Sequence, residues 1–143
     1  MTYTIEAVQF ETVIVPPNYK DRMIDHARMR FPNECCGVLG GRKNIITSVY
    51  PITNDMDSPQ GYKANEKELF EAVRKMRAKG EEMIGLYHSH PHGDGDPSPQ
   101  DKEQNLYPDH FYFIISFPET MDEPLMRCFV MTEDKHFHPI EMI

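Results

Sequence analysis

The segment from His88 to Asp101 concentrates side chains that can bind a metal ion. It has the sequence H-S-H-P-H-G-D-G-D-P-S-P-Q-D, in which two imidazoles, His88 and His90, are followed by the Asp101 carboxylate. Two His and one carboxylate are a common ligand set of a catalytic zinc site, where the fourth position is left for water. Structural zinc sites in small domains usually use several Cys in C-x2-C pairs, and this sequence has none. The residue types therefore indicate a catalytic zinc centre.

Two predicted elements would bring these ligands together. Residues 83–87 are apolar at both odd and even positions, which point to opposite faces of a strand. This pattern predicts a central strand covered on both faces. His88 and His90 come at the end of that strand, where alternate residues point to the same face about 6.6 Å apart along the strand. Residues 98–101 predict a helix start, with Ser at the N-cap, Pro at the first position and Asp in the first turn. Asp101 can thus supply a third ligand across the Gly-rich loop.

Hydrolysis at such a centre also needs a group that moves a proton. Zinc lowers the pKa of a bound water and polarises a carbonyl. A separate carboxylate must then take the proton of the water and return it to the leaving amine. Glu34 is the candidate, because it stands just before the short apolar run Cys35 to Leu39, whereas most other acids fall on predicted helix faces or in loops.

Each of these features also has an ordinary structural explanation. An H-x-H pair is common by chance and is usually structural or solvated. A second pair, His136-Phe137-His138, has no carboxylate arranged around it, and we expect it to be structural. Ser98 and Asp101 can form a helix cap and nothing more, and Glu34 can be a surface acid that follows a helix. No single residue decides between these explanations and a zinc site.

The composition is that of a small acidic protein. The 143 residues match the commonest size of one domain, and we expect residues 1–143 to form a single one. With 15 basic and 23 acidic residues the net charge is −8, which disfavours nucleic acids and anionic membrane surfaces as partners. The segment Met1 to Phe10 lacks the features of a targeting signal, and no stretch approaches the ~20 apolar residues of a membrane helix.

The cysteines indicate a reducing compartment. There are three, Cys35, Cys36 and Cys128, an odd number with two of them adjacent, so the sequence contains no disulfide framework. This usage predicts a cytoplasmic protein. Cys35 and Cys36 are expected to be unreactive core residues.

The remaining pattern predicts an α+β fold in which a mixed or largely antiparallel sheet is flanked by two main helices. The first helix is expected from an Asn18 cap to about Arg30. The second is expected from an Asn65 cap, with Glu68 completing a capping box, to Gly80. Besides the central strand, we expect strands over Thr12–Val15, Cys35–Leu39 (followed by a turn at Gly40-Gly41), Ile45–Ile52, Phe111–Phe117, Leu125–Thr132 and Lys135–Ile140.

Taken together, the candidate residues resemble the signature of the JAMM (MPN-plus) metalloprotease family. That signature is a distant Glu, then H-[ST]-H, seven residues and S-x-x-D, and Glu34, His88-Ser89-His90, Ser98 and Asp101 fill every position. The segment P-N-E-C-C-G-V-L-G also resembles the P-x-E-x-C-G-x-L segment of stand-alone prokaryotic members. The likeness covers nearly the whole chain from about residue 12.

The resemblance implies a curved mixed sheet between helices, with the cytidine deaminase-like (JAB/MPN) architecture. His88, His90 and Asp101 would bind Zn2+, and a water would complete the site. Glu34 would be the general base and then the general acid, and Ser98 would help to stabilise the oxyanion of the tetrahedral intermediate. His92 is not a motif position, but it lies close enough in sequence to touch a substrate.

The resemblance also implies a substrate class. Family members cleave peptide or isopeptide bonds after the C-terminal Gly-Gly tail of ubiquitin-like proteins, and stand-alone prokaryotic relatives act on sulfur-carrier proteins, for example by releasing cysteine. This chain lacks the long insertions with which eukaryotic deubiquitinases grip ubiquitin, which favours a small ubiquitin-like or sulfur-carrier partner. The sequence leaves the leaving group open between cysteine, a lysine side chain and other adducts.

Three other functions compete with this one. A non-catalytic MPN-type scaffold or binding module for ubiquitin-like tails would usually have lost zinc ligands, and this chain keeps all of them. A DNA-repair role like that of the RadC proteins, whose H-N-H-P-S-G-D-P segment resembles His88 to Pro97, is disfavoured by Ser89, the acidic charge and the missing helix-hairpin-helix region. A cytidine deaminase would need a P-C-x-x-C ligand pair, which is absent.

Overall fold

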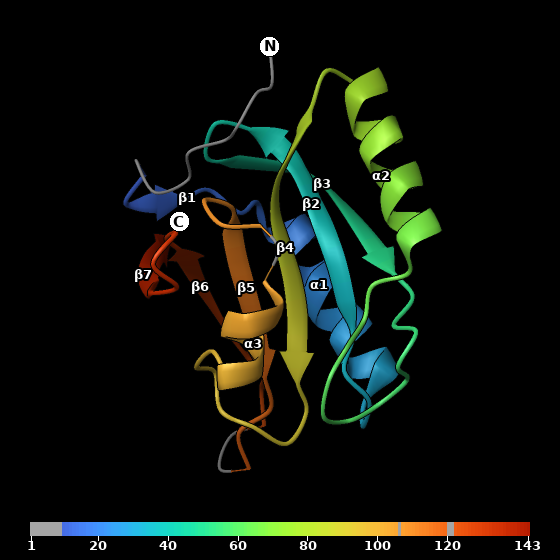
Figure 1. Cartoon of the computed structure of the whole chain (residues 1–143), viewed down its shortest axis with the longest axis vertical. Helices are drawn as coiled ribbons and strands as arrows, with labels where there is room; N and C mark the ends of the chain where they lie inside the picture. The colour runs from blue at the N-terminus through green and yellow to red at the C-terminus, as the bar shows by residue number, and fades with distance from the viewer. Residues whose placement is uncertain (1–9, 106, 120–121) are drawn as a thin grey trace.

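The computed structural model describes residues 10–105, 107–119 and 122–143. It contains one mixed sheet with the strand order β1-β7-β6-β5-β4-β2-β3 (Figure 1). The strands are β1 (Thr12–Val13), β2 (Cys36–Arg42), β3 (Ile45–Ile52), β4 (Glu82–His90), β5 (Phe111–Ser116), β6 (Leu125–Met131) and β7 (Phe137–Met142). The helices are α1 (Pro17–Arg30), α2 (Glu66–Ala78) and α3 (Pro99–Gln104). The predicted α+β class with a mixed sheet is confirmed.

Strand β4 lies inside the sheet and pairs with β2 in antiparallel and with β5 in parallel orientation. A parallel pair cannot be joined by a tight hairpin and needs a crossover connection. Here the crossover from β4 to β5 contains α3, so the chain leaves the end of β4, passes over the sheet and returns. This connection brings residues 98–101 back to the strand that carries His88 and His90.

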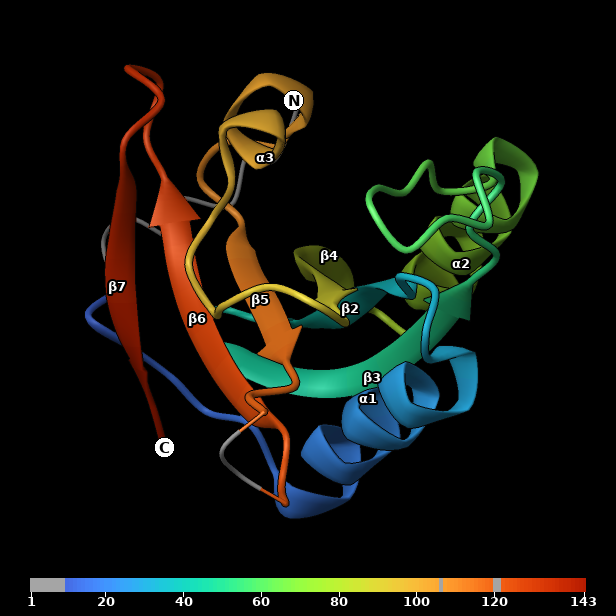
Figure 2. The same ribbon diagram turned by 90° about the horizontal axis from the view of Figure 1, so that it is seen from below.

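The helices cover opposite faces of the curved sheet. Figure 2 shows α1 against one face and α2 and α3 on the other. Adjacent residues of β4 divide between these two layers, since Tyr87 packs in the cluster that includes Met23 of α1, and Leu86 packs in the cluster that includes Met76 of α2. His88 follows the alternation of Leu86, and it therefore points to the face that carries α2 and α3.

Three expectations about element ends are wrong. Helix α1 begins at Pro17 with Pro16 at the N-cap, and Asn18 does not cap it, because proline already has the backbone angle that the first helical turn needs. Strand β2 runs on through Gly40 and Gly41, since glycine permits the close approach of β3 there: a Cβ would meet the Ser48 side chain or the Ile45 backbone. The other expected strands are present, with ends shifted by up to three residues.

The third error concerns the cap of α2. Asn65 accepts a hydrogen bond from the Glu68 backbone N–H (3.0 Å), as predicted. The Glu68 carboxylate, however, accepts from the backbone N–H and the hydroxyl of Thr53 (2.9 and 3.0 Å) and does not complete a capping box. Glu68 therefore ties α2 to the polar connection 53–64, whose ends are held together by an isolated bridge between Asn54 and Ala64.

Two further expectations concern a membrane-spanning helix and an N-terminal targeting signal. In the parts of the chain described above, no helix is long and apolar enough to cross a membrane. The expectation for Met1 to Phe10 concerns residues 1–9, which lie outside the described ranges.

Candidate metal centre and catalytic cleft

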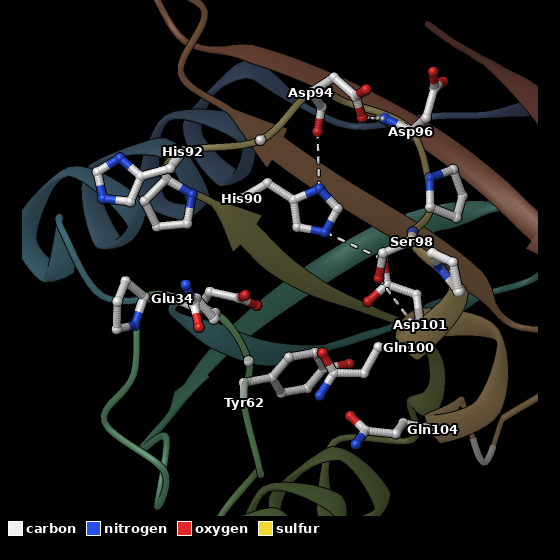
Figure 3. A pocket seen from close by; sticks show the side chains of 17 residues that line it. Glu34, Tyr62, His90, His92, Asp94, Asp96, Ser98, Gln100, Asp101 and Gln104 are labelled. Atoms are coloured by element: carbon white, nitrogen blue, oxygen red, sulfur yellow. Dashed lines mark hydrogen bonds and ion pairs between the residues drawn. The ribbon is translucent and has the colours of Figure 1, made fainter.

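The side chains of His88, His90 and Asp101 converge on one point beside the end of β4. The Nε2 atoms of His88 and His90 lie 2.9 Å apart. Asp101 Oδ1 is 3.2 Å from His88 Nε2, and Asp101 Oδ2 is 3.1 Å from His90 Nε2. The three ligand atoms all lie within 4.8 Å of one another. Figure 3 shows His90 and Asp101 facing each other.

Neighbouring groups fix the orientation of each of these side chains. His90 Nδ1 lies 2.8 Å from the Asp94 carbonyl oxygen, so Nδ1 carries a proton and Nε2 is the nitrogen that faces Asp101 and could bind a metal. Asp101 lies in a capping box, in which its Oδ2 accepts from the Ser98 backbone N–H (2.8 Å) and its own N–H donates to Ser98 Oγ (3.1 Å). The ring of Tyr62 stacks on His88, with centroids 4.8 Å apart and planes at 26°.

The electrostatics of the cluster keep the carboxylate ionised and act in opposite directions on the two imidazoles. Burial lowers the pKa of His88, although Asp101 opposes the shift. Burial also acts to lower the pKa of His90, but the hydrogen bonds to Asp101 and to the Asp94 carbonyl outweigh it and raise that pKa. Burial acts to raise the pKa of Asp101, yet the hydrogen bonds from both imidazoles hold it well below its usual range. The ionised Asp101 and the neutral His88 are in the protonation states that bind metal ions, and His90 would release a proton when a metal binds.

The donor set fits a zinc ion. Two imidazole nitrogens 2.9 Å apart can share at most one proton, and both face the same carboxylate. Within the described residues, His88 Nδ1 is buried without a hydrogen-bond partner. The polar contacts of this ring are therefore all made by Nε2, which is the nitrogen that could bind a metal. Two His nitrogens and one carboxylate oxygen that converge in this way match a catalytic zinc site in number and type.

Glu34 lies beside this cluster and is held by backbone contacts on both sides. Its N–H donates to the Ser58 carbonyl (2.8 Å), and its carbonyl accepts from Asn54 Nδ2 (3.0 Å). On the other side, the Cys35 N–H donates to Ser89 Oγ (2.8 Å), which ties the start of β2 to β4 between the two histidines. Glu34 is 8% exposed.

Burial raises the pKa of Glu34 to about 7, although the charge of His90 opposes the shift. A carboxyl with a pKa near neutrality suits a group that must both accept and release a proton.

The cluster opens into a cleft of about 550 Å³. One wall is formed by Pro59 to Tyr62 and the other by the segment from His90 to Asp101, with Glu34 between them (Figure 3). Ser98 lines the cleft as well. Because Ser98 Oγ accepts a hydrogen bond from Asp101, its own O–H remains available to donate into the cleft.

The structure thus brings together all five residues that the sequence selected: Glu34, His88, His90, Ser98 and Asp101. The second H-x-H pair, His136 and His138, is not part of this cluster. Both side chains are exposed, and the carboxylate of Asp134 lies 3.9 Å from His136 Nε2. Cys35 and Cys36 are buried, and burial raises their pKa values to about 11 and 12, as expected of unreactive core thiols.

Three supporting contacts were missed by the sequence analysis. The Asp94 carbonyl that orients His90 gives no signal in the sequence, because every residue has a carbonyl. The hydroxyl of Ser89 lies within the H-S-H motif, but its partner, the Cys35 N–H, is distant in sequence. Tyr62 is an aromatic residue in a polar connection, which was a visible signal, but its stacking on His88 depends on the path of the chain.

We expect the substitution Glu34→Gln to stabilise the metal-free protein at pH 8 but not at pH 5. The pKa of Glu34 is raised from 4.5 to about 7 on folding, so between these values the folded protein holds a proton that the unfolded chain has released. The free energy of unfolding therefore falls as the pH rises through this window. Glutamine removes the buried charge, and the expected gain at pH 8 is about 1–3 kcal/mol.

Urea unfolding of chelator-treated protein at the two pH values measures this effect. Glu103→Gln, at an exposed position of α3, serves as the control and should change the free energy of unfolding at neither pH. An equal gain for Glu34→Gln at pH 5 and pH 8 would contradict the assignment of a raised pKa to Glu34.

Comparison with known proteins places the chain in a family. Residues 16–131 match the model of prokaryotic homologs of the JAB domain. A desampylase of Haloferax volcanii is 32% identical over 68% of this chain and 75% of its own length, and a CysO-cysteine peptidase of Mycobacterium bovis is 30% identical over 73% of each. A solution structure of a protein from Desulfitobacterium hafniense superposes with a TM-score of 0.82 at 33% identity over 92% of both chains. This chain therefore belongs to the prokaryotic homologs of the JAB domain.

Proposed function

We propose that this protein is a zinc-dependent metallohydrolase that cleaves a peptide or isopeptide bond after the C-terminal Gly-Gly tail of a ubiquitin-like or sulfur-carrier protein. The observation that carries the proposal is the convergence of His88, His90 and Asp101 in one cleft with the buried Glu34. The relatives named desampylase and CysO-cysteine peptidase support the reaction type and the class of substrate.

In this proposal His88, His90 and Asp101 hold the metal, and each of the other two selected residues has one task. When bound, zinc polarises the scissile carbonyl and lowers the pKa of water. Glu34 accepts a proton from the attacking water as the water oxygen bonds to the carbonyl carbon. It then delivers this proton to the nitrogen as the C–N bond breaks. The Ser98 O–H donates a hydrogen bond to the oxygen that becomes negatively charged.

The wall from Pro59 to Tyr62 is the proposed binding surface for the Gly-Gly tail. It belongs to the polar connection 53–64, in which Ser58 and Gly61 form an isolated antiparallel bridge. An extended tail can pair with such a segment as an additional strand. Glycine has no side chain to recognise, so backbone hydrogen bonds would have to select for it.

We also place the protein in the cytoplasm. All three cysteines are buried and free, which agrees with a reducing compartment.

The protein is expected to bind about one zinc ion per chain. His88→Ala, His90→Ala and Asp101→Ala should each abolish stoichiometric binding, because three ligands cannot be reduced to two without a large loss of affinity. His136→Ala and His138→Ala are matched controls, since they alter the other H-x-H pair, and they should retain the metal. Metal analysis after gel filtration measures the zinc content. Full zinc content in His88→Ala would refute the assignment.

Glu34→Gln should separate catalysis from metal binding. The amide has the shape of the carboxylate but cannot accept the proton, so turnover should fall by about 10²–10⁴-fold with zinc retained. Ser98→Ala should lose about 10²–10³-fold, and thermal unfolding must be measured alongside because the same serine caps α3. Mass spectrometry of a cleaved tail adduct reports the rate. Wild-type turnover in Glu34→Gln would mean that another residue is the base.

A substrate tail in which the penultimate Gly is replaced by Val should not be cleaved. Its branched side chain would clash with the wall from Pro59 to Tyr62, provided that the tail lies along this wall as a strand. Comparison of the two adducts under identical conditions tests this, with a substitution several residues before the tail as the control. Equal rates for the Gly and Val tails would show that the cleft does not select for Gly-Gly.

A further inference from the structure

The side-chain amide of Asn54 joins Glu34 to one wall of the catalytic cleft. Its Nδ2 donates to the Glu34 carbonyl oxygen (3.0 Å) and to the Gly61 carbonyl oxygen (3.1 Å). Its Oδ1 accepts from the backbone N–H groups of Met56 (3.0 Å) and Lys63 (2.9 Å). An amide has two N–H donors and one oxygen with two lone pairs. Asn54 therefore uses its whole hydrogen-bonding capacity in this one place.

The two ends of the amide have different tasks. The contact of Oδ1 with the Met56 N–H, two residues further on, is that of an Asx turn, so the oxygen shapes the loop. An aspartate would serve equally well for this task. Its carboxylate, however, could not donate to the two carbonyl oxygens, and only the nitrogen of Asn54 reaches Glu34. The requirement for Asn at this position therefore comes from the bonds to Glu34 and Gly61.

Residues 54–63 hold the backbone of Glu34 from two sides. The Glu34 N–H donates to the Ser58 carbonyl (2.8 Å), and the Glu34 carbonyl accepts from Asn54. Glu34 lines the cleft, whereas Asn54 does not. Since a side chain is directed by its own backbone, the place of the Glu34 carboxyl in the cleft depends on this loop.

Gly61 is the point at which Asn54 is attached to the wall from Pro59 to Tyr62. It is buried, and a Cβ at this position would lie 3.2 Å from Gln100 Nε2 of α3, so the wall fits closely against that helix. Two further contacts close the loop without the donors of Asn54: the Asp55 N–H donates to the Lys63 carbonyl (2.8 Å), and Ser58 forms a bridge with Gly61. The wall can therefore keep its shape when the bond to Glu34 is lost.

We propose that Asn54 is a positioning residue that anchors Glu34 to the wall along which the tail lies. The inference rests on the proposed function, in which the tail is aligned by the wall and the proton is accepted by Glu34. The two must be in register, because a misplacement of about 1 Å can cost about 10²-fold in rate. Asn54 supplies this register through one NH2 group that holds both carbonyl oxygens.

Two substitutions remove the donors in different ways. Asn54→Asp keeps the shape of the side chain and the acceptor for the loop. Asn54→Ser has a short hydroxyl that cannot bond to both carbonyls, and it adds no charge next to Glu34. Asn44→Asp is the matched control, because Asn44 is also half-buried and donates from Nδ2 to a carbonyl, that of Thr12 (3.1 Å), but does not line the cleft.

Each variant is first checked for thermal unfolding and zinc content. Both Asn54 variants should retain about one zinc per chain, since the hydrogen bonds of Asn54 go to none of the three ligand residues. The substrate is a peptide that ends in Gly-Gly, joined in one preparation to cysteine and in another to lysine Nε, and the faster adduct is used. Mass spectrometry gives kcat for each variant, and calorimetry gives Kd for the free peptide.

The expected result is a loss of turnover without a loss of tail binding. Asn54→Asp and Asn54→Ser should lower kcat about 10- to 100-fold, while Kd for the free Gly-Gly peptide changes less than about threefold. Asn44→Asp should change neither. In a Glu34→Gln background, Asn54→Ser should lower the residual kcat by less than about threefold, because a base that is absent cannot be misplaced.

Different outcomes overturn different claims. A wild-type kcat in both Asn54 variants would overturn the inference and leave the proposed function intact. An equal fall in kcat with and without Glu34 would mean that Asn54 acts through another group, and a tail affinity weakened as much as kcat would mean that it only shapes the loop. If one variant does not fold, the other decides, and if neither folds, the inference is wrong. If the wild type cleaves neither adduct, the proposed function fails, and the inference fails with it.

Discussion

The parallel pairing of β4 with β5 is the constraint on which the site depends. Parallel strands require a crossover, and in this protein the crossover supplies the loop after His90, the cap residue Ser98 and the ligand Asp101. A hairpin at this point would have sent the chain straight back along β4 with no element above the histidines. The connection that completes the sheet also completes the cluster of possible metal ligands.

The cluster is preorganised by contacts that do not involve a metal. Asp101 is fixed by the capping box of α3, His90 by the Asp94 carbonyl and His88 by the ring of Tyr62. Side chains held in this way lose little conformational freedom when a ligand binds, which is the general advantage of a rigid site. The short helix α3 thus serves a local purpose, because its first turn holds the carboxylate while the Ser98 hydroxyl, which accepts from the Asp101 N–H, can still donate a hydrogen bond.

Glu34 illustrates the opposition between stability and chemistry. A buried carboxylate is unfavourable unless hydrogen bonds or opposite charges compensate for the lost hydration. The hydrogen bonds described above go to the backbone of residues 34 and 35, and not to the carboxyl group of Glu34. The pKa of the group is raised to about 7 as a result. The fold therefore accepts a local loss of stability at a position where a proton carrier would be needed, as is common at active sites. The Ser89 hydroxyl contributes indirectly, because it anchors the chain beside Glu34.

The sequence by itself determined the identity of the candidate site and the class of the fold. Its local signals were strong for α2, for the buried strands and for the cap at Ser98, because hydrophobic periodicity and capping depend on residues close together in the chain. It failed at Gly40-Gly41 and at the second half of the Glu68 cap, where contacts with a distant segment outweighed the local preference. It also failed at Asn18, where the prolines before it set the start of α1. Only the tertiary structure decided that Tyr62 stacks on His88, that the Asp94 carbonyl orients His90 and that the Phe31 ring contacts the Phe117 ring. These contacts join residues far apart in sequence or use backbone atoms common to all residues, and no pattern of residue types along one chain encodes them.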